Sequence, residues 1–379
     1  MAGLRIAMLG FRGIGDTLPG GIERHAAELA WRMVEKGHAV DVFCRPGYVP
    51  DPPAPYKGVT RILKPAVRTK HLEAITHTLA CLPAIAFGYD IIHFHAMGPS
   101  LLSGIPRLFL RNVVATVHGL DFERAKWGRV ASLALRAGAW AAGTFPDATI
   151  VVSRTLEDYY RDAMKRETVY IPNGVSEPAH RPLDLLARKF GLEPGGYFLS
   201  LGRLTPEKGV HRLIAAFQKV DTAKRLVVAG DEMLDRSYTK KLREVAGCDP
   251  RIVFSGGIYG AEKDEAFSNA FAFVLPSEVE GLSVVMLEAM SYRCPVLTSD
   301  IPENMEISRG AESEQGKPAC RFFKSGDVDD LARALAGLLN DGELPAMASR
   351  ARDFVLSRYG WDEMKDRTLA VYERVAGEG

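Results

Sequence analysis

The sequence lacks the features that mark membrane-spanning, disulfide-bonded and nucleic-acid-binding proteins. No apolar stretch free of charge reaches about 18 residues, the length that spans a bilayer, so we expect no transmembrane helix. The five cysteines are scattered without a C-x-x-C pair, a pattern that favours neither a disulfide framework nor a zinc site. The formal net charge of +1 gives no overall field for nucleic acid. The first residues show no signal-peptide layout, so we expect a cytoplasmic protein.

Composition indicates an ordinary globular protein with charge distributed unevenly between its halves. The 379 residues suit two domains, and 47% of them are hydrophobic. Residues 1–170 hold 21 Lys and Arg against 15 Asp and Glu, whereas the remainder holds 27 against 32. The net charges are therefore +6 and −5. Between Asp51 and Glu73 the charged residues are all basic: Lys57, Arg61, Lys64, Arg68 and Lys70. A solvated loop explains such a basic segment, and a patch that contacts anionic lipid is the alternative.

Short apolar runs alternate with helical patterns along the whole chain, which predicts βαβ units and buried parallel sheets. The expected strands of the first half are Arg5–Gly10, Ala39–Cys44, Ile91–His95, Val113–His118, Thr149–Ser153 and Val169–Pro172. Those of the second half are Tyr197–Gly202, Arg225–Ala229, Ile252–Ser255, Phe271–Leu275, Val296–Ser299 and Arg321–Phe323. Two such sets predict two doubly wound α/β domains.

The expected domain boundaries follow from where proline and glycine gather. We predict a first domain over residues 1–176, a linker over 177–194 and a second domain over 195–358. We expect a last helix within residues 359–379. Ligands bind outside the carboxyl ends of the strands in such sheets. We therefore expect these ends of the two domains to face each other across a cleft.

Two glutamates, Glu280 and Glu288, stand eight residues apart where an expected strand gives way to a helix. Gly281 provides the turn, and Ser283 is suited to be the N-cap. If most of the spacing is helical, the carboxylates lie about 12 Å apart, which is near the span of a sugar, a diphosphate and a ribose. Free backbone N–H groups near Val284 would face the diphosphate. A surface helix can also carry such a pair without function.

A second motif, Gly-Arg-Leu-Thr-Pro-Glu-Lys-Gly, follows the first strand of the second domain. Thr205 is suited to cap a helix that has Pro206 at its first position. Arg203 and Lys208 would then both lean toward the helix start. Two cations at that place suit the charge that develops on a leaving nucleoside diphosphate. A solvated pair of cations is the alternative.

The first domain has a glycine-rich run from Gly20 to His25 that opens a helix. Gly20 and Gly21 would allow a phosphate to approach the backbone closely. The run is not the dinucleotide fingerprint, because Cys44 and Arg45 stand where a ribose-binding acid would be expected. A plain turn is the alternative.

Histidines mark the ends of two neighbouring strands in the first domain. His118 ends one strand, and Gly119 opens the chain beyond it, which would place the imidazole at the rim of the cleft. A lone histidine in this position can also be structural. His93 and His95 share one face of the other strand, and we expect them to pack or to line an acceptor loop rather than to bind metal.

Together these motifs resemble those of the retaining nucleotide-sugar glycosyltransferases of family 4, which have the GT-B fold. The resemblance runs from Gly20 to the final helix and rests on Glu-x7-Glu, Arg-x4-Lys and Gly-Gly-x-Glu-x-His. Two positions depart from the family pattern. Arg293 stands where a glycine is usual, and Asp300 stands where a small polar residue is common. These departures bear on the identity of the sugar and the acceptor.

The resemblance implies a role for each candidate residue. Arg203 and Lys208 would stabilise the departing diphosphate, while Glu280 would orient the sugar. The implied catalytic residues are Glu280, His118, Arg203 and Lys208. The implied donor-binding residues are Gly20, Gly21, Arg203, Lys208, Ile258, Gly281, Leu282, Ser283, Val284 and Glu288. A backbone amide near Ile258 would read the base, and Glu288 would hold the ribose. No metal and no cofactor beyond the nucleotide-sugar substrate are expected.

The resemblance also implies the partners of the chain. The acceptor would be a sugar or a lipid-linked sugar, so the protein could contact the inner face of an anionic membrane peripherally. Two alternatives remain from the sequence. One is a nucleotide-sugar epimerase or phosphorylase on the same fold, and the other is a two-domain binding protein without catalysis.

Overall fold

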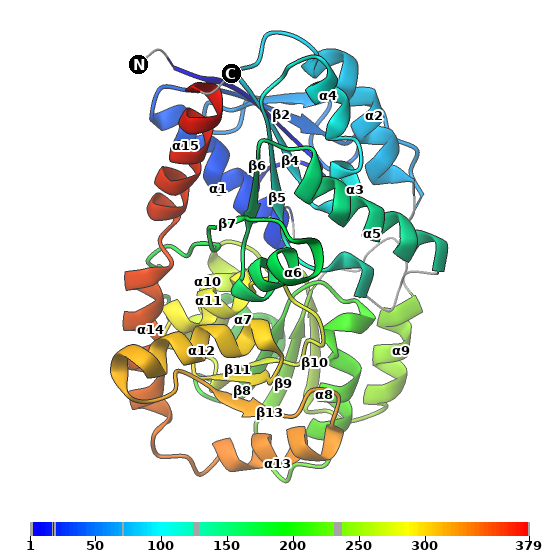
Figure 1. Ribbon diagram of the computed structural model, residues 1–379. Coiled ribbons are helices and arrows are strands. Elements are labelled where there is room, and N and C mark those ends of the chain that lie inside the picture. Colours follow the sequence, from blue (N-terminus) through cyan, green and yellow to red (C-terminus); the bar gives the residue numbers. More distant parts are fainter. Residues whose placement is uncertain are drawn as a thin grey trace. The chain divides into compact units, whose positions relative to one another are not determined.

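Each half of the chain builds its own parallel β-sheet in the computed structural model (Figure 1). The structure describes residues 3–16, 18, 20–69, 72–123, 129–230 and 237–377. The chain divides into unit 1, which is Met1–Gly174 with Trp361–Gly379, and unit 2, which is Val175–Gly360. The prediction of two doubly wound α/β domains is confirmed.

Unit 1 holds a seven-stranded sheet in the order β3-β2-β1-β4-β5-β6-β7, with every pair parallel. Its strands are β1 (Arg5–Leu9), β2 (Ala39–Cys44), β3 (Thr60–Leu63), β4 (Ile91–His95), β5 (Val113–Val117), β6 (Ala148–Val151) and β7 (Val169–Tyr170). Its helices are α1 (Gly21–Glu35), α2 (Glu73–Ile85), α3 (Met97–Ser100), α4 (Gly104–Leu108), η1 (Asp121–Glu123), α5 (Arg129–Thr144), α6 (Arg154–Met164) and α15 (Trp361–Gly377).

The last helix, α15, is part of unit 1 and packs beside α1 (Figure 1). The Oη atom of Tyr372, on α15, lies 2.6 Å from Nδ1 of His93 in β4. At the start of the helix, a Cβ added at Gly174 would lie 2.6 Å from the Trp361 side chain, so only glycine fits at this approach. These contacts tie the end of the chain to the middle of the unit 1 sheet.

Unit 2 holds a six-stranded parallel sheet in the order β10-β9-β8-β11-β12-β13. Its strands are β8 (Tyr197–Leu201), β9 (Arg225–Ala229), β10 (Ile252–Gly256), β11 (Ala272–Leu275), β12 (Val296–Ser299) and β13 (Arg321–Phe323). Its helices are α7 (Leu185–Phe190), η2 (Pro206–Lys208), α8 (Val210–Phe217), α9 (Ser237–Ala246), α10 (Ala261–Asn269), α11 (Val284–Ser291), α12 (Pro302–Gln315), α13 (Val328–Leu338) and α14 (Leu344–Arg358).

The segment that the sequence suggests as a linker, residues 177–194, contains α7 and belongs to unit 2. Leu186 of α7 is buried. Glu265 accepts hydrogen bonds through Oε2 from the backbone N–H groups of Asp184 and Leu186, each at 3.1 Å. This carboxylate satisfies N–H donors that the first turn of a helix leaves without partners.

Within the described residues, no helix combines the length and the apolar character that crossing a membrane requires.

Candidate active site

The order of the unit 2 sheet places a ligand site between β8 and β11. These strands are neighbours, but the chain runs outward from them in opposite directions, and sheets of this kind bind ligands at the carboxyl ends of the strands where the order reverses. The loop after β8 carries Arg203 and Lys208. The loop after β11 carries Glu280, Gly281 and Leu282. The two motifs singled out in the sequence of this unit therefore meet at the position where such sheets bind ligands.

Lys208 and Glu280 form an ion pair between these two loops. Lys208 Nζ donates to Glu280 Oε1 at 2.5 Å. The Lys208 side chain is 18% exposed and the Glu280 side chain 9%, so the pair is largely shielded from water. An ion pair in such surroundings interacts more strongly than one at the surface. The motifs predicted separate roles for these two residues, and their contact could not be predicted from the sequence.

A glycine holds the two loops in close contact. Gly209 has a φ of 66°, and a Cβ added there would lie 2.0 Å from the carbonyl oxygen of Pro276. In addition, the N–H of Glu278 donates to the carbonyl oxygen of Glu207 at 2.9 Å. Any larger residue at position 209 would push the Lys208 loop away from the Glu280 loop. The glycine at the end of the motif is therefore required by packing within unit 2.

Three buried hydroxyls in these two loops lack a hydrogen-bond partner among the described residues: Thr205 Oγ1, Ser277 Oγ and Ser283 Oγ. Thr205 and Ser283 occupy N-cap positions, as predicted, but their side chains make no capping hydrogen bond. The predicted capping hydrogen bonds are therefore absent. Pro206 begins a short 3-10 turn, η2, which precedes α8. Buried hydroxyls normally find partners. These three are therefore available to a bound molecule or water.

Glu288 also forms an ion pair, with a lysine that was not predicted from the sequence as a site residue. Lys263 Nζ, from the first turn of α10, donates to Glu288 Oε1 at 2.8 Å. Helix α11 begins at Val284, so only the second part of the spacing from Glu280 to Glu288 is helical, contrary to the assumption in the sequence analysis. Ile258 is buried in the loop after β10, at the same carboxyl edge of the sheet.

In unit 1 the corresponding reversal of strand order lies between β1 and β4. Three histidines gather there: His25 on α1, His95 at the end of β4 and His118 directly after β5. Nδ1 of His95 and Nε2 of His118 share a hydrogen bond at 3.1 Å. The His25 ring packs against the His118 ring at 4.8 Å between centroids. His25 belonged to the Gly-Gly-x-Glu-x-His run but was not selected as a site residue from sequence.

Burial keeps these histidines neutral. It lowers the pKa of His25 to about 4, although a hydrogen bond to Asn173 opposes the shift. Burial, and then the proximity of other histidines, lowers the pKa of His95 and His118 well below the ordinary value. One nitrogen from each of the three rings lies within 4.8 Å of the others, a spacing that a metal ion could also use. His93 packs with Tyr372 and Thr116 instead, as the sequence analysis expected.

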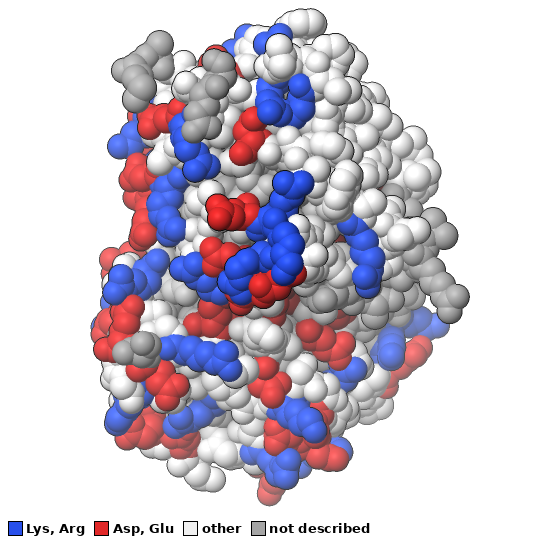
Figure 2. Space-filling view, in the orientation of Figure 1, with Lys and Arg blue, Asp and Glu red and all other residues white. Residues whose placement is uncertain are grey.

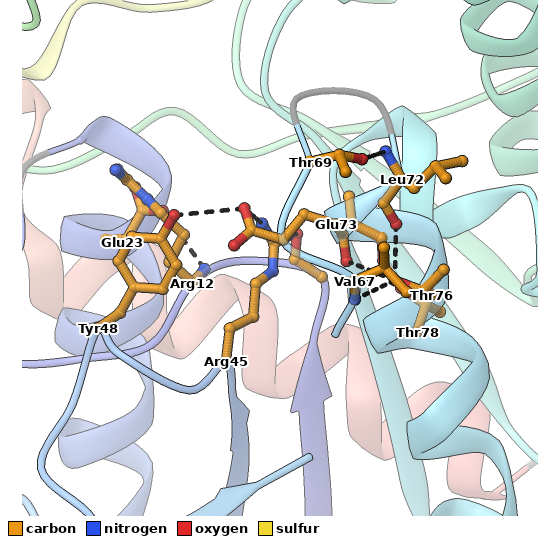
Figure 3. Close-up of polar contacts among 12 residues, drawn as sticks. Arg12, Glu23, Arg45, Tyr48, Val67, Thr69, Leu72, Glu73, Thr76 and Thr78 are labelled. Carbon is orange, nitrogen blue, oxygen red and sulfur yellow. Dashed lines mark hydrogen bonds and ion pairs between the residues drawn. The ribbon is translucent and has the colours of Figure 1, made fainter. Parts of the chain in front are cut away.

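Gly20 and Gly21 begin α1, where Gly20 has a φ of 133°. A Cβ at Gly20 would lie 2.2 Å from Glu23 Oε2 and 2.9 Å from Arg12 Nη2. Arg12 Nε donates to Glu23 Oε1 at 2.8 Å, and both side chains are buried (Figure 3). In this structure the group that comes close to the Gly20 backbone is therefore this ion pair.

A second buried ion pair lies beside the first, at the carboxyl end of β2 (Figure 3). Arg45 Nη1 donates to Glu73 Oε2 at 3.3 Å, and Tyr48 Oη donates to the same oxygen at 3.3 Å. Arg45 Nη2 also donates to the carbonyl oxygen of Gly10 at 3.4 Å. Arg45, which stands in place of a ribose-binding acid, thus joins the β1 and β2 loops to the start of α2.

Arg293, which departs from the family pattern, has a backbone conformation that favours glycine. This residue follows the end of α11 with a φ of 56°, a left-handed conformation that glycine adopts at lower cost. Its N–H donates to the carbonyl oxygen of Met290 at 3.0 Å. The conformation explains why a glycine is the more usual residue at this position.

Two family models match the chain, one over each unit. The model described as "Glycosyltransferase Family 4" matches residues 19–177, and "Glycosyl transferases group 1" matches residues 186–353. Phosphatidyl-myo-inositol mannosyltransferase of Mycolicibacterium smegmatis is 28% identical over 388 aligned positions, which cover 96% of this chain and 92% of the relative.

Solved structures with similar folds cover nearly the whole chain. Sucrose-phosphate synthase from Thermosynechococcus elongatus has a TM-score of 0.82 at 20% identity, covering 99% of this chain and 100% of that one. Anabaena Alr3699/HepE in complex with UDP-glucose has a TM-score of 0.79 at 17% identity, covering 98% and 100%.

Two Rossmann-like units with a candidate site at a switch point in strand order define a protein of the GT-B fold class. The chain belongs to the family 4 type of glycosyltransferases, and it is a glycosyltransferase.

Proposed function

We propose that the protein transfers a sugar from a nucleoside-diphosphate sugar to a hydroxyl group of an acceptor, with retention of the anomeric configuration. The observation that carries the proposal is the Lys208–Glu280 ion pair at the reversal of strand order in unit 2. It provides a cation for a diphosphate and a carboxylate for sugar hydroxyls in one place. The unpartnered hydroxyls of Thr205, Ser277 and Ser283 add neutral hydrogen-bonding groups beside them.

The proposed reaction needs no nucleophile from the protein. The bond between the anomeric carbon and the β-phosphate oxygen breaks, and the acceptor oxygen bonds to the same face of that carbon. The acceptor proton passes to an oxygen of the departing diphosphate. Arg203 and Lys208 stabilise the negative charge that develops there. Glu280 orients the sugar, and Glu288 holds the ribose.

The first unit contributes a neutral histidine in this proposal. His118 offers the transferred sugar a hydrogen bond. Because burial lowers the pKa of His118, its ring carries no charge that would oppose an electron-poor sugar in the transition state. His25 and His95 support that ring from two sides.

Transfer is proposed to be independent of metal. Arg203 and Lys208 supply positive charge where a divalent ion would otherwise act. If a metal did take part, His25, His95 and His118 are the described residues whose spacing could hold one. A chelator therefore tests this point directly.

The proposed acceptor is a glycolipid or a polysaccharide intermediate. The full-length similarity to a phosphatidyl-myo-inositol mannosyltransferase supports a lipid-linked acceptor. The net charge of +6 over residues 1–170 supports contact with an anionic membrane. An enzyme that contacts the membrane peripherally could reach such an acceptor without a spanning helix.

The test combines nucleotide binding with product analysis. A panel of nucleoside diphosphates and their sugars should raise the melting temperature for the matching base, because a ligand of the native state stabilises it by mass action. The matching donor is then incubated with lipid-linked and soluble acceptors, with and without excess EDTA. Retained anomeric configuration and turnover in EDTA are expected. An epimerised donor without transfer, binding without turnover, or loss of activity restored by Mg²⁺ or Zn²⁺ would contradict the proposal.

A further inference from the structure

Three histidines of unit 1 come together from three separate elements. His25 belongs to α1, His95 ends β4 and His118 follows β5, so residues far apart in the sequence meet at the carboxyl end of the sheet. One nitrogen from each ring lies within 4.8 Å of the other two. Burying polar rings together costs free energy unless each nitrogen finds a partner. The arrangement therefore points to a ligand that all three rings share.

His95 has a nitrogen that the fold leaves unsatisfied. Its ring is fully buried, and its Nε2 atom has no hydrogen-bond partner among the described residues. The hydrogen bond that Nδ1 shares with Nε2 of His118, at 3.1 Å, occupies only one of the two nitrogens of His95. Buried polar atoms are normally paired, so a missing partner marks a place where a bound ion or water completes the site.

The basic segment identified from sequence, in contrast, has partners within the fold. Lys57 lies over the Trp31 ring at 4.8 Å, and Arg61 donates to two backbone carbonyl oxygens at 2.7 and 3.1 Å. Lys70 lies outside the described residues. The side chains of Lys57 and Arg61 are therefore engaged within unit 1, whereas Nε2 of His95 has no such contact.

His25 is held in the way that is usual for a histidine that binds a metal. Its Nδ1 atom lies 2.9 Å from Oδ1 of Asn173. Because an amide oxygen can only accept a hydrogen bond, the proton of neutral His25 is on Nδ1, and Nε2 keeps its lone pair. Metal-binding histidines commonly donate their other N–H to such an acceptor, which fixes the tautomer. Burial lowers the pKa of His25 to about 4 and so favours the neutral ring that metals bind.

The spacing of the three nitrogens is close to what a zinc ion requires. Zinc binds histidine nitrogens at about 2.0–2.1 Å in a tetrahedral arrangement, which places two such nitrogens about 3.4 Å apart. Nδ1 of His95 and Nε2 of His118 are already 3.1 Å apart. Since no pair within the cluster is more than 4.8 Å apart, closing movements of about 1.4 Å or less would complete the site.

The chemistry of the three rings selects a class of metal ion. Mg²⁺ and Ca²⁺ prefer oxygen ligands, whereas Zn²⁺ and Co²⁺ accept imidazole nitrogen. Three histidines leave the fourth position of a tetrahedral zinc ion to water or another ligand. His118 is partly exposed, whereas His25 and His95 are buried. An ion would therefore reach the cluster from the side of His118.

We propose that His25, His95 and His118 bind Zn²⁺ and that the bound ion inhibits sugar transfer. The binding depends on the three histidines alone. The inhibition rests on the proposed function, in which His118 contacts the transferred sugar. Two positive charges beside an electron-poor sugar would oppose the transition state, which a neutral His118 does not. Zinc would thus act as a reversible inhibitor of a transferase that needs no metal for its reaction.

The first measurement is binding of Co²⁺ and Zn²⁺ to the full chain in excess Mg²⁺. Cys248, which is exposed, is replaced by serine throughout, because its thiol could bind the same ions. Carboxylates lie among lysines and arginines over much of the face shown in Figure 2, and the excess Mg²⁺ occupies such oxygen sites. We expect a single Co²⁺ ion per chain, with the visible absorption of a nitrogen-bound ion of low coordination number. Zn²⁺ should abolish this absorption by replacing the cobalt ion.

Two variants should change the affinity in opposite directions. His118→Gln should bind Zn²⁺ at least about 100-fold more weakly, because losing a ligand costs more than the 10- to 100-fold effect of losing the group behind a ligand. Asn173→Asp should bind Zn²⁺ more tightly, since a carboxylate accepts the Nδ1 proton of His25 more strongly than an amide does. Melting temperatures without metal check that each variant folds. A gain in one folded variant and a loss in the other cannot be explained by misfolding.

Two histidines outside the cluster provide matched controls. His38, in unit 1, accepts a hydrogen bond through Nδ1 from the N–H of Leu4 at 3.0 Å. His211, in unit 2, has its Nδ1 atom 2.9 Å from Oη of Tyr238. His38→Gln and His211→Gln should bind both ions as the Cys248→Ser protein does, because each removes an imidazole that the proposed site does not use.

The second measurement is sugar transfer with and without Zn²⁺. Zn²⁺ should inhibit the enzyme and EDTA should restore its activity, while the same concentration of Mg²⁺ should have no effect. Three outcomes would overturn the inference: no visible absorption from Co²⁺, Zn²⁺ binding that His118→Gln leaves unchanged, and bound Zn²⁺ that does not slow transfer. If no donor supports transfer, the absorption of Co²⁺ and its loss in His118→Gln still decide whether the metal site exists. Failure of the metal site is therefore distinguishable from failure of the proposed function.

Discussion

Lys208 and Glu280 are hydrogen-bonded at 2.5 Å across two loops that begin at the carboxyl ends of neighbouring strands. The contact means that the cation proposed for the diphosphate and the carboxylate proposed for the sugar hold each other in position before substrate binds. A site that is already organised in this way loses less free energy to reorganisation when the charge moves.

The ion pair predicts that substitutions of its two members are not additive. Lys208→Ala and Glu280→Gln should each lower kcat/KM by about 100-fold, on the order of 3 kcal/mol. The double variant should lose much less than the sum, because either single change already disrupts the pair. We expect a coupling of about 1–3 kcal/mol in a double-mutant cycle. Full additivity in the measured kcat/KM values would show that the two side chains act independently.

Arg203 is expected to act on the leaving group alone. Arg203→Ala should lower kcat/KM by about 100-fold, because charge stabilisation in the transition state is lost while the fold remains. A donor with a better leaving group should suffer less from the substitution. The measurement compares both donors with the unchanged enzyme and the variant. Near-normal turnover of the variant would remove Arg203 from the diphosphate site.

Glu288 should affect binding more than turnover, since ribose contacts are similar in the ground state and the transition state. Glu288→Ala should raise the Kd for the nucleoside diphosphate and leave kcat nearly unchanged, whereas Glu280→Gln should mainly lower kcat. Lys263→Ala provides a matched test, because it removes the partner that holds Glu288 at 2.8 Å. It should reproduce part of the Glu288 defect. If the defects of Glu280 and Glu288 are exchanged, the proposed orientation of the donor is reversed.

The sequence predicted features that depend on neighbouring residues along the chain. It did not predict features that depend on contacts between separate elements. Strands such as Ala39–Cys44 and Val296–Ser299 are apolar runs with clear ends, and they were predicted with their observed bounds. The short helices α3 and α4 were missed, because four or five residues show no helical period. The contact between Lys263 and Glu288 could not be predicted, since it depends on how α10 lies beside α11.

Arg293 gives a test of backbone strain in unit 2. Arg293→Gly should raise the free energy of unfolding by about 1 kcal/mol, because glycine adopts the φ of 56° without a steric cost. Glycine's greater freedom in the unfolded chain opposes part of this gain. Urea unfolding monitored in unit 2 measures the difference. Arg293→Ala is the control, since alanine retains the Cβ and should gain little. Lower stability of the glycine variant would mean that the arginine side chain contributes more than its backbone costs.

The buried histidines of unit 1 predict loss of stability in mild acid. Burial and, to a smaller extent, the charge of Arg45 together lower the pKa of His77 from an ordinary value of 6.5 to about 4. Between these values the unfolded chain binds a proton that the folded chain does not, so stability rises with pH. Above pH 6.5, His77 does not reduce the free energy of unfolding. As the pH falls toward 4, His77 reduces this free energy by at most about 1.4 kcal/mol per pH unit.

His77→Gln tests this dependence, because glutamine does not titrate. The slope of unfolding free energy against pH, measured from urea titrations between the two pKa values, should become shallower in the variant. The site histidines should add to the same slope, because burial also lowers the pKa of His25 to about 4. An unchanged slope in His77→Gln would show that His77 is protonated equally in the folded and unfolded chain.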